Sequence, residues 1–574
     1  MSIARACAAL LLLCAVAVPL RAEPVAGDPA FAALAGELLD GIVARRPTRG
    51  ARLGLHALDG RLPDLSPEGI AATRAWLDEA LGRLDAVDPT LLSPLQRAER
   101  ATLRATLSTW VFDWTTRRVL ERDPRALLAT VSVAETIKRD YAPLHVRASA
   151  ALALAKAAPA FLRAGEARLD RRLPGPVLET AIAQTRGTAA FVRGQVRARF
   201  AALGSRVERE ELDHALAGLA AALDEYAAAL EGRRDEADDD FRLGKEAFLE
   251  LLRRAHGFAL PLGRLREIFE ADLARNTAAL AEAAAEIDPD ADVAHVVERV
   301  LADRPPADRV LQTAAQQAER LRDGIGALDL VRIPGDDPLR VVVTPPYLRF
   351  NMAFLDAPGP FETKAMPSFY YITPPDPAWP PERQAAYVPA TNDLLFITAH
   401  EAWPGHFLQS LHRKEVPSRV LRALGSSATS EGWAHYTEEL AIETGLVEGP
   451  EAHVGQLVNA LLRDVRCLSA IGLHTGRMSV ARSERLFRRR AYQDEANAHQ
   501  QAWRGTFDPM YLVYTLGKLA IYEMREDVRA RTRSEGGTFR LRDFHEAFLS
   551  FGNAPLPAIR EALLGAEAGP PLAR

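Results

Sequence analysis

Apolar side chains recur at the spacing of an amphipathic α-helix through nearly all of residues 27–330. Two long examples are LETAIAQTRGTAAFVRGQVRARFAAL, residues 178–203, and LDHALAGLAAALDEYAAALEG, residues 212–232. Runs of β-branched and aromatic residues, which favour strands, are nearly absent there. Because a period of 3.6 residues places one apolar stripe on each segment, this part of the chain is predicted to be a set of packed helices.

The composition changes near residue 331, where short β-branched and aromatic runs bounded by proline begin. The runs at 339–344 and 368–372 predict two strands of a small antiparallel or mixed sheet. A helix is predicted over 392–403, and helical patterns then continue nearly to the C-terminus. The predicted fold class is therefore mostly α, with a small sheet beside the helix at 392–403. The edge of the 368–372 strand is a candidate for binding an extended peptide by strand addition.

The first 22 residues, MSIARACAALLLLCAVAVPLRA, have the layout of a secretory signal peptide. A basic residue is followed by an apolar run too short to span a bilayer and by Ala22 at the expected cleavage site. A retained membrane anchor is the alternative, because Leu20 stands where a small residue is usual. We therefore expect a periplasmic or secreted protein with no stable membrane insertion after cleavage.

The cysteines are few, and two of them, Cys7 and Cys14, lie within the predicted signal peptide. Cys14 follows Leu13 rather than a small residue, which argues against a lipoprotein cleavage site. Cys467 alone would remain after cleavage, so the mature chain can form no internal disulfide.

The mature chain, residues 23–574, shows no fixed-period repeat and no linker that would separate domains. We expect a single large domain with a helical part over about 23–330 and a second part over about 331–574. The formal net charge of −5 and the absence of a basic stretch other than solvated helix faces give no reason to expect nucleic acid as a partner.

The stretch TAHEAWPGHFLQ, residues 398–409, contains the most distinctive spacing of polar residues. His400 and His406 are six positions apart, which on a regular helix would separate them by about 120°. Pro404 would also end a helix at this point. If Pro404 and Gly405 form a wide turn, the two imidazoles can face each other. Two interpretations stay open here, a metal site with unusual spacing and a helix end with two structural histidines.

The next segment, TSEGWAHYTEEL, favours the metal site. Glu431 follows His406 by twenty-five positions and begins an amphipathic helix. Two histidines and a carboxylate from a second helix make up a three-ligand zinc set with one open position. Glu431, His435 and Glu438 share one helical face, so their polar groups point together. A solvated surface stripe is the alternative interpretation.

HEAWPGHFLQ and EGWAHYTEE resemble the motifs H-E-x-x-P-G-H-x-x-Q and E-G-W-A-x-Y-x-E of the bacterial "domain of unknown function 885" family. That family is grouped with zinc metallopeptidases of the gluzincin type, distantly similar to angiotensin-converting enzyme and the thermostable carboxypeptidases. LGLHALDGRLPDLS, from residue 53, and YTLGKLAI, from residue 514, also resemble the family's opening and closing patterns. The resemblance covers nearly the whole mature chain and implies a large helical metallopeptidase-like fold.

The resemblance implies that His400, His406 and Glu431 bind Zn²⁺ and that Glu401 is the general base. A carboxylate next to a ligand can reach the water that zinc makes acidic, take its proton and deliver it to the leaving amine.

Two further segments match the family and would supply hydrogen-bond donors to an oxyanion. RCLSAIGLHTG resembles R-x-x-x-D-x-G-x-H, with Arg466 and His474 matching. Ala470 departs from the family's aspartate, which puts the orientation of His474 in doubt. Tyr514 matches in DPMYLVYTLGK, and Tyr511 lies about one helical turn earlier. The resemblance makes Tyr514 and His474 candidate catalytic residues, whereas a buried core tyrosine is the alternative for Tyr514.

The leading hypothesis is an exported zinc-dependent peptidase that acts on peptides or small amide substrates. One alternative is a metal-dependent hydrolase of a non-peptide amide or ester, since a fold does not determine a substrate. Another is a non-catalytic helical binding protein with a structural zinc, in which His435 would be the fourth ligand. Arg477 and Arg504 are candidates for holding a substrate carboxylate.

Overall fold

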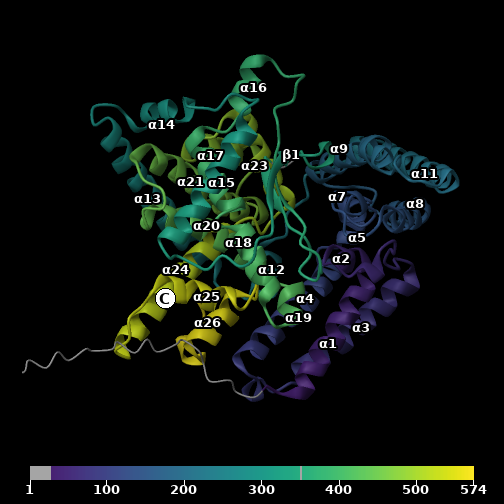
Figure 1. Ribbon diagram of the computed structural model, residues 1–574, viewed down its shortest axis with the longest axis horizontal. Helices are drawn as coiled ribbons and strands as arrows, with labels where there is room; N and C mark the ends of the chain where they lie inside the picture. The colour runs from purple at the N-terminus through teal and green to yellow at the C-terminus, as the bar shows by residue number, and fades with distance from the viewer. Residues whose placement is uncertain (1–26, 350–351, 574) are drawn as a thin grey trace, which may run out of the picture.

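The computed structural model describes residues 27–349 and 352–573. Within them the protein is mostly α-helical with one small mixed sheet, which confirms the predicted fold class (Figure 1). None of the helices in these two ranges is long and apolar enough to cross a membrane. The predicted signal peptide at 1–22 lies outside the described residues, and the single-domain division of 23–574 stays a prediction.

Helices of the first half begin at residues that satisfy free backbone N–H groups. Ser66 and Ser205 accept from the backbone N–H groups of Gly69 and Glu208, and Ser93 forms a capping box with Gln96. The helices of this half are α1 (Pro29–Arg45), α2 (Pro47–Arg52), α3 (Pro67–Asp85), α4 (Pro94–Thr115), α5 (Val119–Arg122), α6 (Arg125–Leu128), α7 (Glu135–Lys138), α8 (Leu144–Glu166), α9 (Gly175–Phe191), α10 (Arg197–Phe200), α11 (Arg206–Glu231), α12 (Lys245–His256), α13 (Leu262–Ile287), α14 (Val293–Ala302) and α15 (Val310–Ala327).

Helices of the second half surround the region that the sequence motifs occupy. They are α16 (Pro381–Tyr387), α17 (Thr391–Glu401), α18 (His406–Glu415), α19 (Arg419–Ala423), α20 (Ser427–Glu443), α21 (Pro450–His474), α22 (Val480–Arg490), α23 (Glu495–Phe507), α24 (Val513–Ser534), α25 (Leu541–Leu549) and α26 (Leu556–Leu564).

The apolar stripes of these helices meet in several cores. In Figure 1, α8, α9 and α11 extend to the right as a long arm, and their buried leucines and alanines form a core of their own. A second core joins α1, α3 and α4 to α19. The largest core is mainly in the second half, where α17, α20, α21 and α24 pack together, and residues of α12, α13 and α15 join it. The helices that carry HEAWPGHFLQ and EGWAHYTEE therefore lie in the most extensively packed part of the molecule.

The sheet contains β1 (Leu339–Val343), β2 (Ala353–Asp356) and β3 (Ser368–Ile372) in the order β1-β3-β2. β1 runs parallel and β2 antiparallel to β3. The two predicted strands are confirmed as β1 and β3. The proposal that the edge of 368–372 binds an extended peptide is wrong, because β3 is central and both its edges are paired. The edge strand next to α17 is β2, which the sequence analysis missed.

The LGLHALDG segment ties the N-terminal helices to the loop that follows β2. His56 lies in a short 3₁₀ turn, His56–Leu58. Its Nδ1 is 3.1 Å from Asp59 Oδ2, and its Nε2 is 3.1 Å from Glu362 Oε1. The ring stacks on Tyr141 with centroids 3.8 Å apart. The contacts of His56 therefore give this segment a structural role.

Helices α20 and α24 cross at a pair of glycines, Gly432 and Gly517. A Cβ added to Gly432 would lie 2.6 Å from the backbone of Gly517, and one added to Gly517 would overlap the carbonyl oxygen of Ala428. Such an approach is open only to residues without a Cβ. The crossing brings Glu431 of α20 and Tyr514 of α24 to the same region of the protein.

Replacing Gly517 by alanine should lower the free energy of unfolding by about 1–3 kcal/mol, because the two backbones must separate to admit the methyl group. Chemical denaturation followed by circular dichroism measures this loss. The matched control is Gly218→Ala on α11, where an added Cβ meets nothing within 4 Å. The control should be neutral or stabilising, and an equal loss in both variants would contradict the close crossing.

Candidate metal centre

Helix α17 ends at Glu401 and α18 begins at His406, so the two histidines do not share a regular helix. Between them the chain folds back on the last turn of α17, and Gly405 N donates to Ala399 O at 3.0 Å. A Cβ at Gly405 would overlap the carbonyl oxygen of His400, so glycine is required there. The rings of His400 and His406 lie 4.7 Å apart between centroids. The wide turn inferred from the spacing is present.

Glu431 of α20 completes a convergent group. Its Oε2 is 3.5 Å from His400 Nε2 and 3.4 Å from His406 Nε2. One ligand atom from each residue lies within 4.8 Å of the others. Nitrogen and oxygen ligands about 2.0–2.1 Å from a tetrahedral zinc ion are about 3.3 Å from one another. The three side chains therefore fit a single zinc ion with little movement.

His400 is oriented by a buried carboxylate on its other side. Its Nδ1 donates to Glu438 Oε1 at 2.7 Å, and both side chains are buried. Arg463 of α21 contacts the same oxygen at 2.9 Å and so balances the charge of Glu438. A ligand histidine that donates its second N–H to a carboxylate is held in one tautomer with Nε2 facing the metal.

The carboxylate of Glu431 also attracts the two histidines by charge. Burial opposes protonation of His400, but hydrogen bonds with Glu431 and Glu438 outweigh it and raise its pKa to about 9. Burial also opposes ionisation of Glu431, yet His406 and His400 hold the pKa of that carboxyl well below its usual range. Metal binding would compete with the proton on His400 Nε2, because a histidine ligand binds with that nitrogen deprotonated.

Glu401 is adjacent to a candidate ligand but is held by a different element. Its Oε2 accepts from the backbone N–H of Leu355 in β2 at 2.8 Å. This hydrogen bond holds one oxygen of the carboxylate at β2, and Glu401 is not part of the group formed by His400, His406 and Glu431. The small sheet therefore has a direct part in positioning Glu401.

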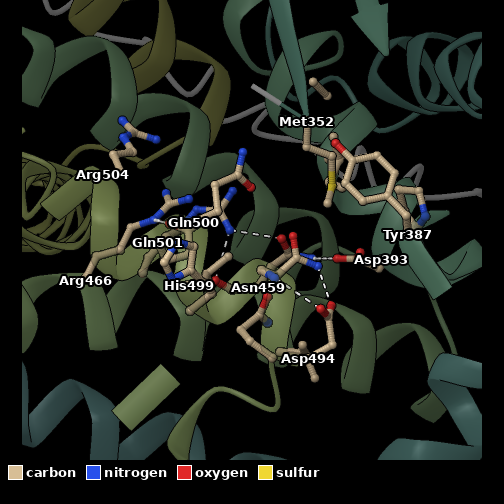
Figure 2. A pocket seen from close by; sticks show the side chains of 18 of the residues that line it. Met352, Tyr387, Asp393, Asn459, Arg466, Asp494, His499, Gln500, Gln501 and Arg504 are labelled. Atoms are coloured by element: carbon tan, nitrogen blue, oxygen red, sulfur yellow. Dashed lines mark hydrogen bonds between the residues drawn. The ribbon is translucent and has the colours of Figure 1, made fainter. Parts of the chain in front are cut away.

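His400, Glu401 and Tyr514 line a cavity of about 730 Å³. This volume is typical of pockets that hold small ligands. In the view of Figure 2, Arg466 and Arg504 lie on one side of the pocket and Met352 and Tyr387 on the other. Burial and the charge of Glu431 raise the pKa of Tyr514, so its hydroxyl stays protonated and can donate.

The structure does not bring His474 to this cavity. Its ring is buried at the end of α21, and Nε2 donates to Gly505 O at 2.8 Å. Burial lowers its pKa to about 4, so the ring is neutral near pH 7. Its Nδ1 is buried without a hydrogen-bond partner. Ala470, one helical turn earlier, is where the family pattern has an aspartate that could accept from this nitrogen.

His435 is also outside the metal group. Among the described residues, the set of side chains that can converge on one ion consists of His400, His406 and Glu431. His435 is fully buried, with Nδ1 3.5 Å from Glu438 Oε2. The group thus has three protein ligands, and the side chains of His406 and Glu431 remain partly exposed.

The sequence analysis missed two groups that position the site residues. Arg463, which balances Glu438, is a charged residue in the otherwise apolar run LVNALLRDV, and that contrast was an available signal. The backbone N–H of Leu355 has no sequence signal, because any residue except proline supplies one. Of the two arginines proposed for a carboxylate, Arg504 lines the cavity, whereas Arg477 is exposed and does not.

Comparison with known proteins agrees with this picture at the level of family and fold. A family model described as "Bacterial protein of unknown function (DUF885)" matches residues 47–563. A candidate lipoprotein of unknown function from Shewanella oneidensis has a similar structure, with a TM-score of 0.76 and 23% identity, covering 94% of this chain and 100% of that one. A candidate lipoprotein from Colwellia psychrerythraea has a TM-score of 0.74 and 17% identity, covering 93% and 98%. No curated protein matches the chain.

The purified protein should bind about one zinc ion per chain, because three ligand atoms converge on one position. His400→Ala and Glu431→Ala should each remove most of the metal, as measured by mass spectrometry of metal content after dialysis. His295→Ala, on the exposed face of α14, is the matched control and should keep it. Full occupancy in both ligand variants would contradict the assignment.

Proposed function

The chain belongs to the bacterial DUF885 family, and from that premise we propose that it is an exported zinc-dependent peptidase. One observation carries the proposal. A three-residue metal group, His400, His406 and Glu431, lies beside a carboxylate, Glu401, that is held by a separate element at the wall of a cavity. A purely structural zinc site is usually closed by a fourth protein ligand and needs no adjacent base.

His400, His406 and Glu431 would hold the zinc ion. When bound, zinc acts as a Lewis acid that makes water acidic near neutral pH and polarises a carbonyl oxygen. The hydrogen bond from His400 Nδ1 to Glu438 keeps Nε2 available for that ion.

Glu401 would act as the general base and then as the general acid. Its Oε2 accepts the Leu355 N–H, so Oε1 is left to accept a proton from the attacking water. The same carboxyl group then donates that proton to the leaving amine nitrogen.

Tyr514 would donate a hydrogen bond to the carbonyl oxygen as it gains negative charge. Its ring stacks beside that of His400 with centroids 6.0 Å apart, and it lines the same cavity. His474 lacks this placement, so we assign it a positioning role instead. Its bond to Gly505 O holds α23, which carries Arg504.

A peptide is favoured over a non-peptide amide or ester by the position of β2. This strand is at the edge of the sheet, its Ala353 lines the cavity, and its Leu355 binds Glu401. An extended peptide could pair with such an edge while its carbonyl group lies near the metal group. Export is supported by the signal-peptide layout at 1–22 and by the description of both structural relatives as candidate lipoproteins.

Replacing Glu401 by glutamine should leave the protein folded and zinc-loaded but lower its rate on peptides by roughly 10²- to 10⁴-fold, because glutamine cannot accept the proton. Incubation with a mixed peptide library, with and without a chelator, read by mass spectrometry, gives the substrate for this assay. Glu451→Gln, exposed at the start of α21, is the control. A Glu401→Gln rate close to that of wild type would rule out Glu401 as the base. A wild type that binds zinc but cleaves nothing would favour a binding protein.

Tyr514→Phe should lower kcat by roughly 10²- to 10³-fold, since one oxyanion donor is lost. The matched control is Tyr511→Phe. Tyr511 donates to Ser469 at 2.8 Å in the core and does not line the cavity. Its loss should affect the midpoint of unfolding more than kcat. Equal effects on kcat in the two variants would contradict a catalytic role for Tyr514.

A further inference from the structure

Three arginines surround the Tyr514 ring at the wall of the cavity. The guanidinium carbons of Arg463, Arg466 and Arg504 lie 5.9, 5.1 and 5.9 Å from the ring centroid. Their charges are not balanced alike. Arg463 pairs with Glu438 at 2.9 Å, and Arg504 pairs with Asp508 at 2.8 Å.

Arg466 has no such partner in residues 27–349 and 352–573. It is only 8% exposed, and its Nε donates to the neutral Gln501 at 2.8 Å. Burial, reinforced by Arg504, lowers its pKa to about 10, so the guanidinium is still charged near pH 7. Figure 2 shows Arg466 beside Gln501 at the pocket.

An unpaired buried charge is costly, and buried charges in proteins are almost always paired. Arg466 lines the same cavity as Glu401 and Tyr514, so a ligand in that cavity can reach it. A guanidinium is suited to a carboxylate, which it can bind through two parallel hydrogen bonds. The missing partner of Arg466 is therefore expected in the substrate.

The distance from the metal group limits where that carboxylate lies. The centroid of the Tyr514 ring is 6.0 Å from that of the His400 ring and 5.1 Å from the Arg466 guanidinium carbon, so the guanidinium lies at most about 11 Å from the His400 ring. An extended chain advances about 3.3–3.6 Å per residue. A few residues of an extended peptide therefore span the distance from the metal group to Arg466.

We propose that Arg466 binds the C-terminal carboxylate of a peptide, so that the enzyme releases a short C-terminal fragment. This inference rests on the proposed peptidase function. Hydrolysis breaks one C–N bond; water supplies OH to the acyl carbon and a proton to the amine of the released fragment. Arg466 takes no part in that step and determines which peptides are bound in register with Glu401.

The test is calorimetric binding to the zinc-loaded Glu401→Gln variant, which should not consume its ligand. The probes are trialanine as the free acid, trialanine amide, and an amide in which the last alanine is replaced by glutamate. The free acid should bind roughly 10- to 100-fold more tightly than trialanine amide, as expected for a charge-assisted hydrogen-bonded pair.

Arg466→Gln in the Glu401→Gln protein should remove the preference for the free acid. Arg466→Lys in the same protein should keep part of that preference, because lysine keeps the charge. Arg477→Gln, on the exposed turn after α21, is the matched control and should keep the full preference. Equal binding of acid and amide by the Glu401→Gln protein with Arg466 intact overturns the proposal. This outcome does not depend on whether an Arg466 variant folds. Tight binding of the glutamate-containing amide assigns the carboxylate to a side chain and overturns the C-terminal assignment.

The two proposals fail in different ways. Wild-type cleavage at internal bonds of long peptides, equal for acids and amides, keeps the peptidase and overturns the role of Arg466. A preference for the free acid that depends on Arg466, in a protein that cleaves no peptide, keeps the carboxylate site and overturns the peptidase.

Discussion

The buried carboxylate of Glu438 is the interaction on which the candidate site depends. It lies on α20 and joins His400 of α17 to Arg463 of α21 through contacts of 2.7 and 2.9 Å. A charge in the protein interior is stable only when paired, and removing one member of such a pair costs about 3–5 kcal/mol. Three helices that are distant in sequence are thus held in one arrangement, which also faces His400 Nε2 toward Glu431.

The rest of the site is built around that contact by close packing. Gly405 lets the chain fold back so that His406 reaches His400, and Gly432 and Gly517 let α24 approach α20 with Tyr514. The sheet adds one group, the Leu355 N–H, which binds Glu401. This hydrogen bond keeps Glu401 beside the candidate ligands but outside their group. Each of the four helices α17, α20, α21 and α24 therefore contributes a polar group from a well-packed core. Rigid placement of this kind is what a proton transfer and an oxyanion contact require.

Helical periodicity was sufficient to predict the mostly α fold, because each apolar stripe is local in sequence. The spacing of His400 and His406 left two interpretations open; Glu431 favoured a metal group, and the family resemblance named all three residues as ligands, which the structure brings together. Strand order was not predictable, since β2 has only four residues and the pairing that makes β3 central is a tertiary contact. The direction of His474 was not predictable either, because it depends on where the backbone of Gly505 lies.

The claim that His400, His406 and Glu431 form a three-ligand zinc site is tested most directly by anomalous diffraction at the zinc absorption edge. The account predicts one strong peak in crystals of the wild-type protein, bonded to His400 Nε2, His406 Nε2 and the Glu431 carboxylate, with no fourth ligand from the protein. Zinc bound elsewhere, zinc closed off by His435, or no peak between these three side chains in zinc-supplemented crystals would contradict it.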